Sequence, residues 1–105
     1  MTRAWSAAGL LLFANTGFAD EAPLQRGEAL LTRDCAKCHA VGPTGASPRS
    51  DAPVFRSLGT RYPIEQLEET LGEGTISGHP DMPEFEFDAT DVSAIIVFLN
   101  AIQAR

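Results

Sequence analysis

The sequence predicts an all-α domain built from three main helices and two long loops. Apolar side chains recur at helical spacing in three segments, and no segment shows the sustained alternation that marks a half-buried strand. The two connecting segments, residues 40–61 and 72–87, hold most of the prolines and glycines in the chain. These residues interrupt regular structure, so we expect loops there and no sheet of consequence.

The first predicted helix opens at Pro23 and runs to Asp34. Proline suits a first helical turn because the N–H that it lacks has no partner at that position. Leu24, Leu30 and Leu31 share one side of this segment, which gives the helix an apolar face. The helix leads directly into the only two cysteines of the chain.

The second and third predicted helices follow the loops. The second comes after Tyr62, has Pro63 in its first turn and ends at Gly72 and Gly74. The third covers residues 88–105, where Asp88 is placed to cap the start, with Asp91 in the capping-box position. Their expected apolar faces are Ile64, Leu67 and Leu71 for the second helix, and Val92, Ile95, Ile96, Leu99 and Ile102, with Phe98 beside them, for the third.

The N-terminal segment has the layout of a secretory signal peptide. Arg3 precedes an uncharged stretch from Ala4 to Ala14, and the small residues Gly17 and Ala19 come just before residue 20. The apolar stretch is much shorter than the roughly 20 residues that a membrane-spanning helix needs. We therefore expect removal of residues 1–19, a single domain over residues 20–105, and a processed protein that does not span a membrane.

Composition and charge exclude some classes of function. A chain of 105 residues with 44% hydrophobic and 21% charged residues is typical of one globular domain. Its net charge of −6 argues against nucleic acid as a partner. Residues 62–105 carry nine acidic and one basic side chain, and residues 20–61 carry five acidic and six basic ones. This asymmetry would orient the protein against a charged partner, although a solvated acidic surface is the simpler interpretation.

The stretch CAKCH, residues 35–39, is the attachment signal of a c-type haem. Two thiols about a helical turn apart can each add to one of the two vinyl groups on a porphyrin edge, and the next imidazole then lies beneath the iron. A zinc site would need both cysteines and both histidines, His39 and His79. A redox dithiol expects βαβ surroundings, which the pattern lacks.

An iron bound by one imidazole has a sixth position to fill, and Met82 is the strongest candidate. It is the only methionine left once residues 1–19 are removed, and it lies in a loop, outside any apolar stripe. Pro80 and Pro83 stiffen that loop. His79 is the competing ligand, and core filling is the other interpretation of Met82. Loops as long as these are uncommon in a compact domain, so we expect both to wrap the haem.

With these residues the chain resembles the class I c-type cytochromes, which are small monohaem bacterial proteins, over residues 22–103. The resemblance rests on CAKCH, on the Met-Pro pair at residues 82–83, and on helices before and after them. It implies thioether bonds from Cys35 and Cys38, with His39 as the proximal and Met82 as the distal ligand. The implied fold is the cytochrome c fold, with three main helices and two loops around one covalently bound haem.

The same resemblance implies supporting roles for further residues. The segment APVFRSL, residues 52–58, resembles Gly-Pro-x-Leu-x-Gly-Leu in the family, although Ala52, Phe55 and Ser57 depart from that pattern. In the family this proline carbonyl accepts a hydrogen bond from the haem histidine, so the role falls to Pro53, with Pro48 as the fallback.

Two helix positions and the haem propionates complete the comparison with the family. Crossed first and last helices would bring Gly27 against Phe98. The chain has one tryptophan, Trp5, which lies in the predicted signal peptide. A tryptophan contact to a propionate is therefore impossible in the processed protein, and the candidates to replace it are Arg49, Arg56, Arg61 and Tyr62.

The predicted function is electron transfer rather than catalysis. With both axial positions occupied, the iron has no vacancy for a substrate, and methionine opposite histidine raises the reduction potential. We expect a monomeric periplasmic one-electron carrier that docks transiently with larger redox proteins. The alternatives are a haem subunit of a larger oxidoreductase complex and a five-coordinate haem sensor or peroxidase-like protein.

Overall fold

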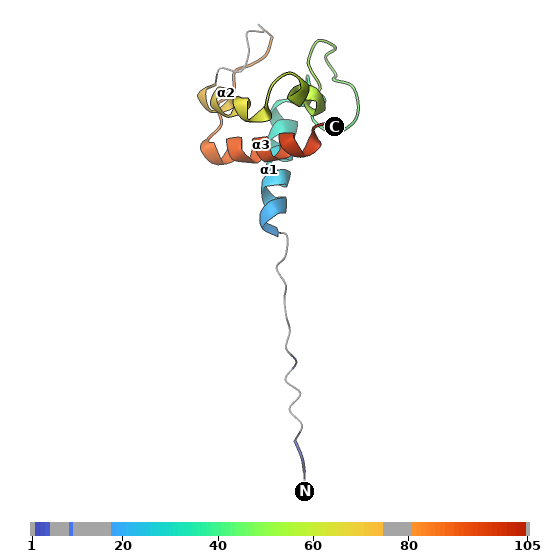
Figure 1. Cartoon of the computed structure of the whole chain (residues 1–105), viewed down its shortest axis with the longest axis vertical. Coiled ribbons are helices and arrows are strands. Elements are labelled where there is room, and N and C mark those ends of the chain that lie inside the picture. Colours follow the sequence, from blue (N-terminus) through green and yellow to red (C-terminus); the bar gives the residue numbers. More distant parts are fainter. Residues whose placement is uncertain (1, 5–8, 10–17, 75–80, 105) are drawn as a thin grey trace.

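The protein is all-α in the part of the chain that its computed structural model describes, residues 2–4, 9, 18–74 and 81–104. Its elements are α1 (Phe18–Asp34), η1 (Phe55–Thr60), η2 (Ile64–Gln66), α2 (Leu67–Glu73) and α3 (Ala89–Ile102), where η denotes a 3₁₀ helix. No strand occurs in these ranges, so the predicted fold class is confirmed. Figure 1 shows α1 crossing α3 steeply, with α2 above α3. None of the described helices is long and apolar enough to cross a membrane.

The crossing of α1 and α3 depends on Gly27. A Cβ atom at this position would lie 2.8 Å from the Cβ of Phe98, and closer still to the carbonyl oxygen of Ala94. The two helices approach this closely only because glycine has no side chain. Next to the crossing, the Nε of Arg26 donates to Asp91 at 2.7 Å and ties the start of α3 to α1. The pairing of Gly27 with Phe98 is confirmed.

The first helix begins earlier than the sequence predicted. It starts at Phe18 and contains Pro23 in its interior, whereas the pattern placed its start at Pro23. Proline removes one backbone hydrogen bond to the preceding turn. The residues before it, Ala19 to Ala22, are compatible with a helix, so α1 extends upstream past the proline. The predicted signal-peptide boundary after Ala19 falls within α1.

The segment between α1 and α2 is more regular than the predicted loop. Residues 55–60 form η1, and its buried side chains Phe55 and Leu58 are spaced by three residues, as one face of a 3₁₀ turn requires. Pro63 caps η2, which continues into α2. The second helix then ends as predicted, because Gly74 adopts the left-handed conformation (φ 82°) and its N–H bonds to the carbonyl of Thr70.

The third helix forms the centre of the core. Asp88 caps its start by accepting a hydrogen bond from the N–H of Asp91 at 2.8 Å, as predicted. The predicted stripe is buried except for the half-buried Ile102. The buried side chains that pack together around α3 are Leu30, Leu31, Phe55, Leu58, Ile64, Leu71, Phe87, Val92, Ile95, Ile96, Phe98 and Leu99.

The change Gly27→Ala is expected to lower the free energy of unfolding by about 1–3 kcal/mol, because the added methyl group overpacks the α1–α3 crossing. Helix propensity alone would favour alanine by about 1 kcal/mol. Urea unfolding of the haem-loaded protein measures the effect. Gly72→Ala is the matched control, since a Cβ there meets nothing within 4 Å. If both changes stabilise the protein equally, Gly27 does not set the crossing.

Candidate haem site

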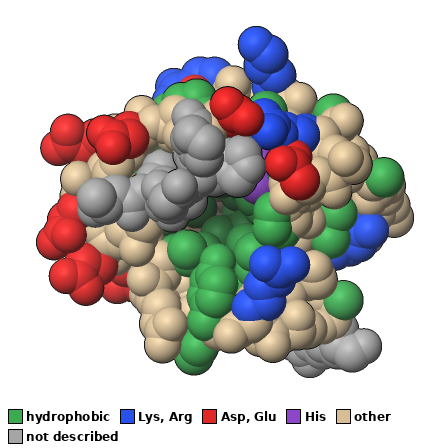
Figure 2. Space-filling model, turned by 90° about the horizontal axis from the view of Figure 1, so that it is seen from above, with side chains coloured by type: hydrophobic (Ala, Val, Ile, Leu, Met, Phe, Trp, Pro, Cys, Tyr) green, Lys and Arg blue, Asp and Glu red, His purple; other side chains and the backbone are tan. Residues whose placement is uncertain are grey.

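The predicted site residues lie around one cavity of about 290 Å³. Its walls include Cys35, Cys38, His39, Pro53 and Met82. The rest of the lining is largely hydrophobic, with several charged residues at the rim. Its uncharged members are Leu31, Ala52, Phe55, Leu58, Tyr62, Leu67, Leu71, Pro83, Phe85, Phe87, Ile95 and Leu99. Figure 2 shows hydrophobic side chains gathered around a hollow on this face of the molecule. An apolar cavity with a few convergent polar groups is the usual form of a cofactor site.

The two cysteines lie on a turn that continues α1. The N–H of Cys35 bonds to the carbonyl of Leu31 at 2.7 Å, and the N–H of His39 bonds to the carbonyl of Cys35 at 2.9 Å. This helical turn brings both free thiols to the cavity. Partial burial, with smaller contributions from the charges of Asp34 and Cys38, raises the pKa of the Cys35 thiol to about 11. At neutral pH the group therefore faces the cavity as an uncharged thiol.

The His39 ring is fixed from two sides. Its Nδ1 lies 2.7 Å from the carbonyl oxygen of Pro53. A carbonyl only accepts, so Nδ1 carries the proton and donates it, and Nε2 keeps its lone pair for a metal. The ring also packs on Phe55, with centroids 4.6 Å apart. The hydrogen bond expected for Pro53 is thus present, and Pro48 is not its acceptor.

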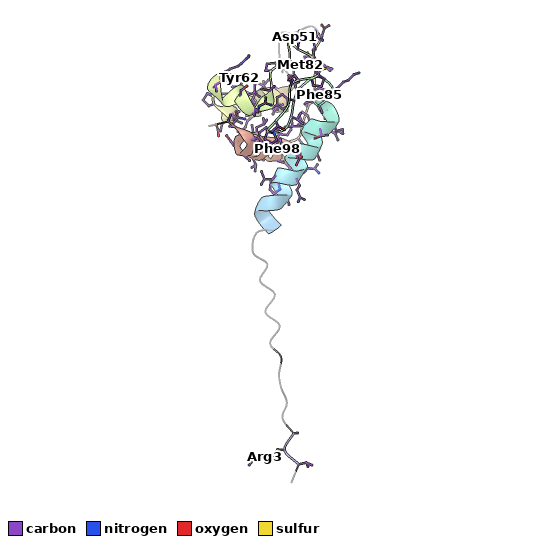
Figure 3. The ribbon with its side chains drawn as sticks, turned by 90° about the vertical axis from the view of Figure 1, so that its right-hand side faces the viewer. Arg3, Asp51, Tyr62, Met82, Phe85 and Phe98 are labelled. Carbon is purple, nitrogen blue, oxygen red and sulfur yellow. The ribbon has the colours of Figure 1, made fainter. Side chains whose placement is uncertain are left out.

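A backbone hydrogen bond anchors the segment that contains Met82 at a point after the methionine. The N–H of Phe87 bonds to the carbonyl of Leu71 at 3.2 Å, which ties this segment to α2. Phe85 and Phe87 stack on each other with centroids 6.2 Å apart. Figure 3 shows Met82 and Phe85 in the upper part of the molecule, away from Phe98. Met82 is half-buried and forms part of the cavity wall, together with the cysteines and His39.

Arg49 has carboxylate partners at the rim of the cavity. Its Nε bonds to Asp51 at 2.5 Å, and one terminal nitrogen lies 2.7 Å from Asp81. The hydrogen bonds to Asp51 and then to Asp81 raise the pKa of Arg49 above its ordinary value. Of the four residues proposed for the propionates, Arg49 and Tyr62 line the cavity. The other two lie outside the described lining, and one of them, Arg56, donates to the carbonyl of Gly45.

Gln103 supports the site from just beyond α3, and no sequence pattern predicts this role. Its amide nitrogen donates to the carbonyls of Phe55 at 2.9 Å and Leu99 at 2.7 Å, and its amide oxygen accepts from the N–H of Gly59. The side chain therefore joins the end of α3 to η1, the helix whose Phe55 packs on His39. A polar residue just past a helix end is common, and only the tertiary contact reveals its role.

The zinc alternative finds little support in the described residues. Across these residues no group of three or more His, Cys, Asp and Glu side chains gathers as a metal site would require. The competing ligand His79 lies outside the residues that the structure describes. The donors that do line the cavity, two thiols, one imidazole and one thioether, are the set that a c-type haem uses. They fit that group.

A comparison with protein families identifies the chain. The model of the family described as cytochrome c oxidase, cbb3-type, subunit III, matches residues 22–99. The chain belongs to this family of cytochrome c domains. Searches of curated proteins and of solved structures found no match.

Membership confirms several predictions in general form. A cytochrome c domain has the all-α cytochrome c fold and contains covalently bound c-type haem, whose attachment motif is present at Cys35 and Cys38. It is an electron-transfer haem protein, with redox partners, and such domains are typically extracytoplasmic. This agrees with the haem expected from CAKCH and with the expected class of function.

The change Gln103→Ala is expected to lower the free energy of unfolding by about 1–3 kcal/mol, because it leaves two carbonyls and one N–H without their partner. Asn100→Ala is the control, since Asn100 is exposed and its side-chain amide donates to Glu65 at the surface, at 3.1 Å. That change should stay within about 0.5 kcal/mol. Denaturant titration of the two haem-loaded variants compares them directly. Equal stabilities would show that Gln103 does not hold η1.

Proposed function

We propose that this protein is a small monohaem cytochrome of class I that carries single electrons between larger redox proteins in the periplasm. The observation that supports it most is the convergence of Cys35, Cys38, His39 and Met82 on one apolar cavity. The four residues come from two parts of the chain that are far apart in sequence. Ordinary core packing gives no reason for these four donor types to share a wall.

On this proposal the two cysteines and His39 hold the haem from the turn after α1. Cys35 and Cys38 would hold it covalently through sulfur, and Nε2 of His39 would be the nitrogen available to its iron. The carbonyl of Pro53 keeps the proton on Nδ1, holds the ring in one orientation and makes the imidazole more electron-rich. Phe55 packs against the His39 ring and limits its tilt.

Met82 would supply a further ligand from the other segment, and the apolar walls would exclude water. When bound, the haem supplies an iron that gains and loses one electron. A thioether opposite an imidazole favours the reduced state and so raises the reduction potential. With both axial positions held by side chains, the protein is proposed to be a carrier and not an enzyme. Export, followed by removal of residues 1–19, would place the protein in the periplasm. We expect it to be a monomer there.

Replacement of Met82 tests the axial assignment. Met82→Ala is expected to remove the thioether signature from the absorption spectrum of the oxidised protein. It should also lower the reduction potential by on the order of 0.1 V, a fraction of the roughly 0.8 V range that axial ligands span. Spectroelectrochemical titration of the matured protein measures both. His79→Ala is the matched control and should change neither quantity.

The same experiment separates the carrier from the other haem functions. If Met82→Ala leaves spectrum and potential unchanged and His79→Ala alters them, the distal ligand is His79 and the assignment of Met82 is wrong. A high-spin spectrum of the unmodified oxidised protein would favour the five-coordinate sensor or peroxidase-like alternative. A low-spin spectrum with thioether coordination supports the carrier.

A second candidate function is a haem subunit of a larger complex. The description of the matching family, a subunit of a cbb3-type cytochrome c oxidase, favours this possibility. Gel filtration of a native extract, with elution detected by haem absorbance, distinguishes a free carrier from a subunit of a complex. A free carrier is expected to elute at the size of a monomer of about 10 kDa, somewhat below the 11.2 kDa of the whole chain. Elution with a far larger assembly would favour the subunit.

A further inference from the structure

Arg49 contacts both parts of the chain that carry the proposed ligands. Its backbone N–H bonds to the carbonyl of Cys38 at 3.1 Å, so its main chain is fixed to the turn that holds the thiols and His39. Its side chain reaches the other segment, where a terminal nitrogen lies 2.7 Å from a carboxylate oxygen of Asp81. Asp81 directly precedes Met82 in the sequence. One residue thus joins the two sides of the site.

A second carboxylate, that of Asp51, orients the guanidinium of Arg49 for its contact with Asp81. Asp51 binds its Nε at 2.5 Å and its terminal nitrogen at 3.2 Å, a two-point contact within the same loop. Such a fork restricts the rotamers of a long side chain, so less freedom remains to be lost on binding the second carboxylate. A lysine at this position would have no planar fork to share between two carboxylates.

The Met82 segment has anchors on both sides of the methionine. Upstream the anchor is the ion pair between Arg49 and Asp81, and downstream it is the backbone hydrogen bond from Phe87 to Leu71. The upstream anchor is exposed, since the side chains of Arg49 and Asp81 are 38% and 59% accessible. It therefore responds to salt and contributes a modest energy. Loss of this anchor leaves the residue before Met82 without that link to the Cys38 side.

We propose that Arg49 and Asp81 are positioning residues that form a strap across the cavity and hold Met82 on the iron. This inference rests on the proposed role of Met82 as axial ligand. The strap favours the state in which the thioether is bound over the state in which it has moved away. It therefore sets how easily an external ligand takes the place of Met82.

The test is a titration of the oxidised, haem-loaded protein with imidazole, followed by loss of the thioether band. Imidazole binds only where Met82 has left, so its apparent affinity reports the population of the open state. Asp81→Asn and Arg49→Gln are each expected to raise that affinity about two- to five-fold, the range of an exposed ion pair. Glu84→Gln is the matched control, because it removes an exposed carboxylate two residues beyond Met82 and should change nothing.

Two further measurements distinguish a strap from a general loss of stability. The double change Asp81→Asn with Arg49→Gln should raise the imidazole affinity by less than the product of the two single effects, because the ion pair between Arg49 and Asp81 is lost in each single variant. Added sodium chloride should raise imidazole affinity in the unmodified protein towards that of Asp81→Asn, and should leave the variant nearly unaffected. The salt titration uses the unmodified protein and does not depend on folding of a variant.

The failures of this inference and of the proposed function are separable. If the unmodified protein shows no thioether band, the role of Met82 fails and the strap fails with it. If the band is present, the strap alone is overturned by any of three results: an imidazole affinity of Asp81→Asn equal to that of the unmodified protein, an equal rise in Glu84→Gln, or single effects that multiply in the double variant.

Discussion

The close approach of α1 and α3 at Gly27 is the constraint on which the rest of the structure depends. The end of α1 continues into the turn that carries both cysteines, and α3 supplies Ile95 and Leu99 to the cavity. The crossing therefore joins the turn that carries the thiols to the helix that supplies part of the apolar wall. At Gly27 the neighbouring atoms are the backbone of Ala94 and the Cβ of Phe98. A change of side-chain rotamer moves neither of them, so the contact cannot relax in that way.

The orientation of the His39 ring depends on a short segment, residues 53–55, that packs against it. Pro53 supplies the hydrogen-bond acceptor and Phe55 the packing surface, and the N–H of Phe55 bonds back to the carbonyl of Ala40 at 3.0 Å. Residues 39–40 and 53–55 thus form a small closed unit. Gln103 and the N–H of Ala104, which bonds to the carbonyl of Arg56, fix this unit to the end of the chain. The imidazole is positioned by contacts that run through η1 to the C-terminus.

Short sequence patterns predict the features of this protein that depend only on neighbouring residues. The CAKCH motif, the Asp88 cap and the end of the second helix at its glycines each follow from a few adjacent residues, and the sequence predicts each of them. The resemblance to a known family added the pair Gly27 and Phe98 and the acceptor Pro53. The helix η1 was missed, since a six-residue 3₁₀ segment has too little periodicity to separate from a loop.

Contacts between distant side chains could not be predicted in the same way. Arg49 and Asp81 are 32 residues apart, and Gln103 and Phe55 are 48 residues apart. Nothing near either pair marks its members as partners, because many exposed arginines and glutamines have no such role. The early start of α1 was missed for a different reason. The pattern at Pro23 predicts a helix start, whereas the loss of one backbone hydrogen bond does not end the helix there.

The crossing of α1 with α3 has a consequence for haem attachment. The partner of α1 at Gly27 belongs to α3, which begins at Ala89, far along the sequence from the two thiols. Contacts between segments so distant in sequence require the closure of a long loop, which slows their formation. Until α3 packs against α1, the turn that carries Cys35 and Cys38 has no α3 wall opposite it, and both sulfur atoms stay accessible to the machinery that joins them to porphyrin.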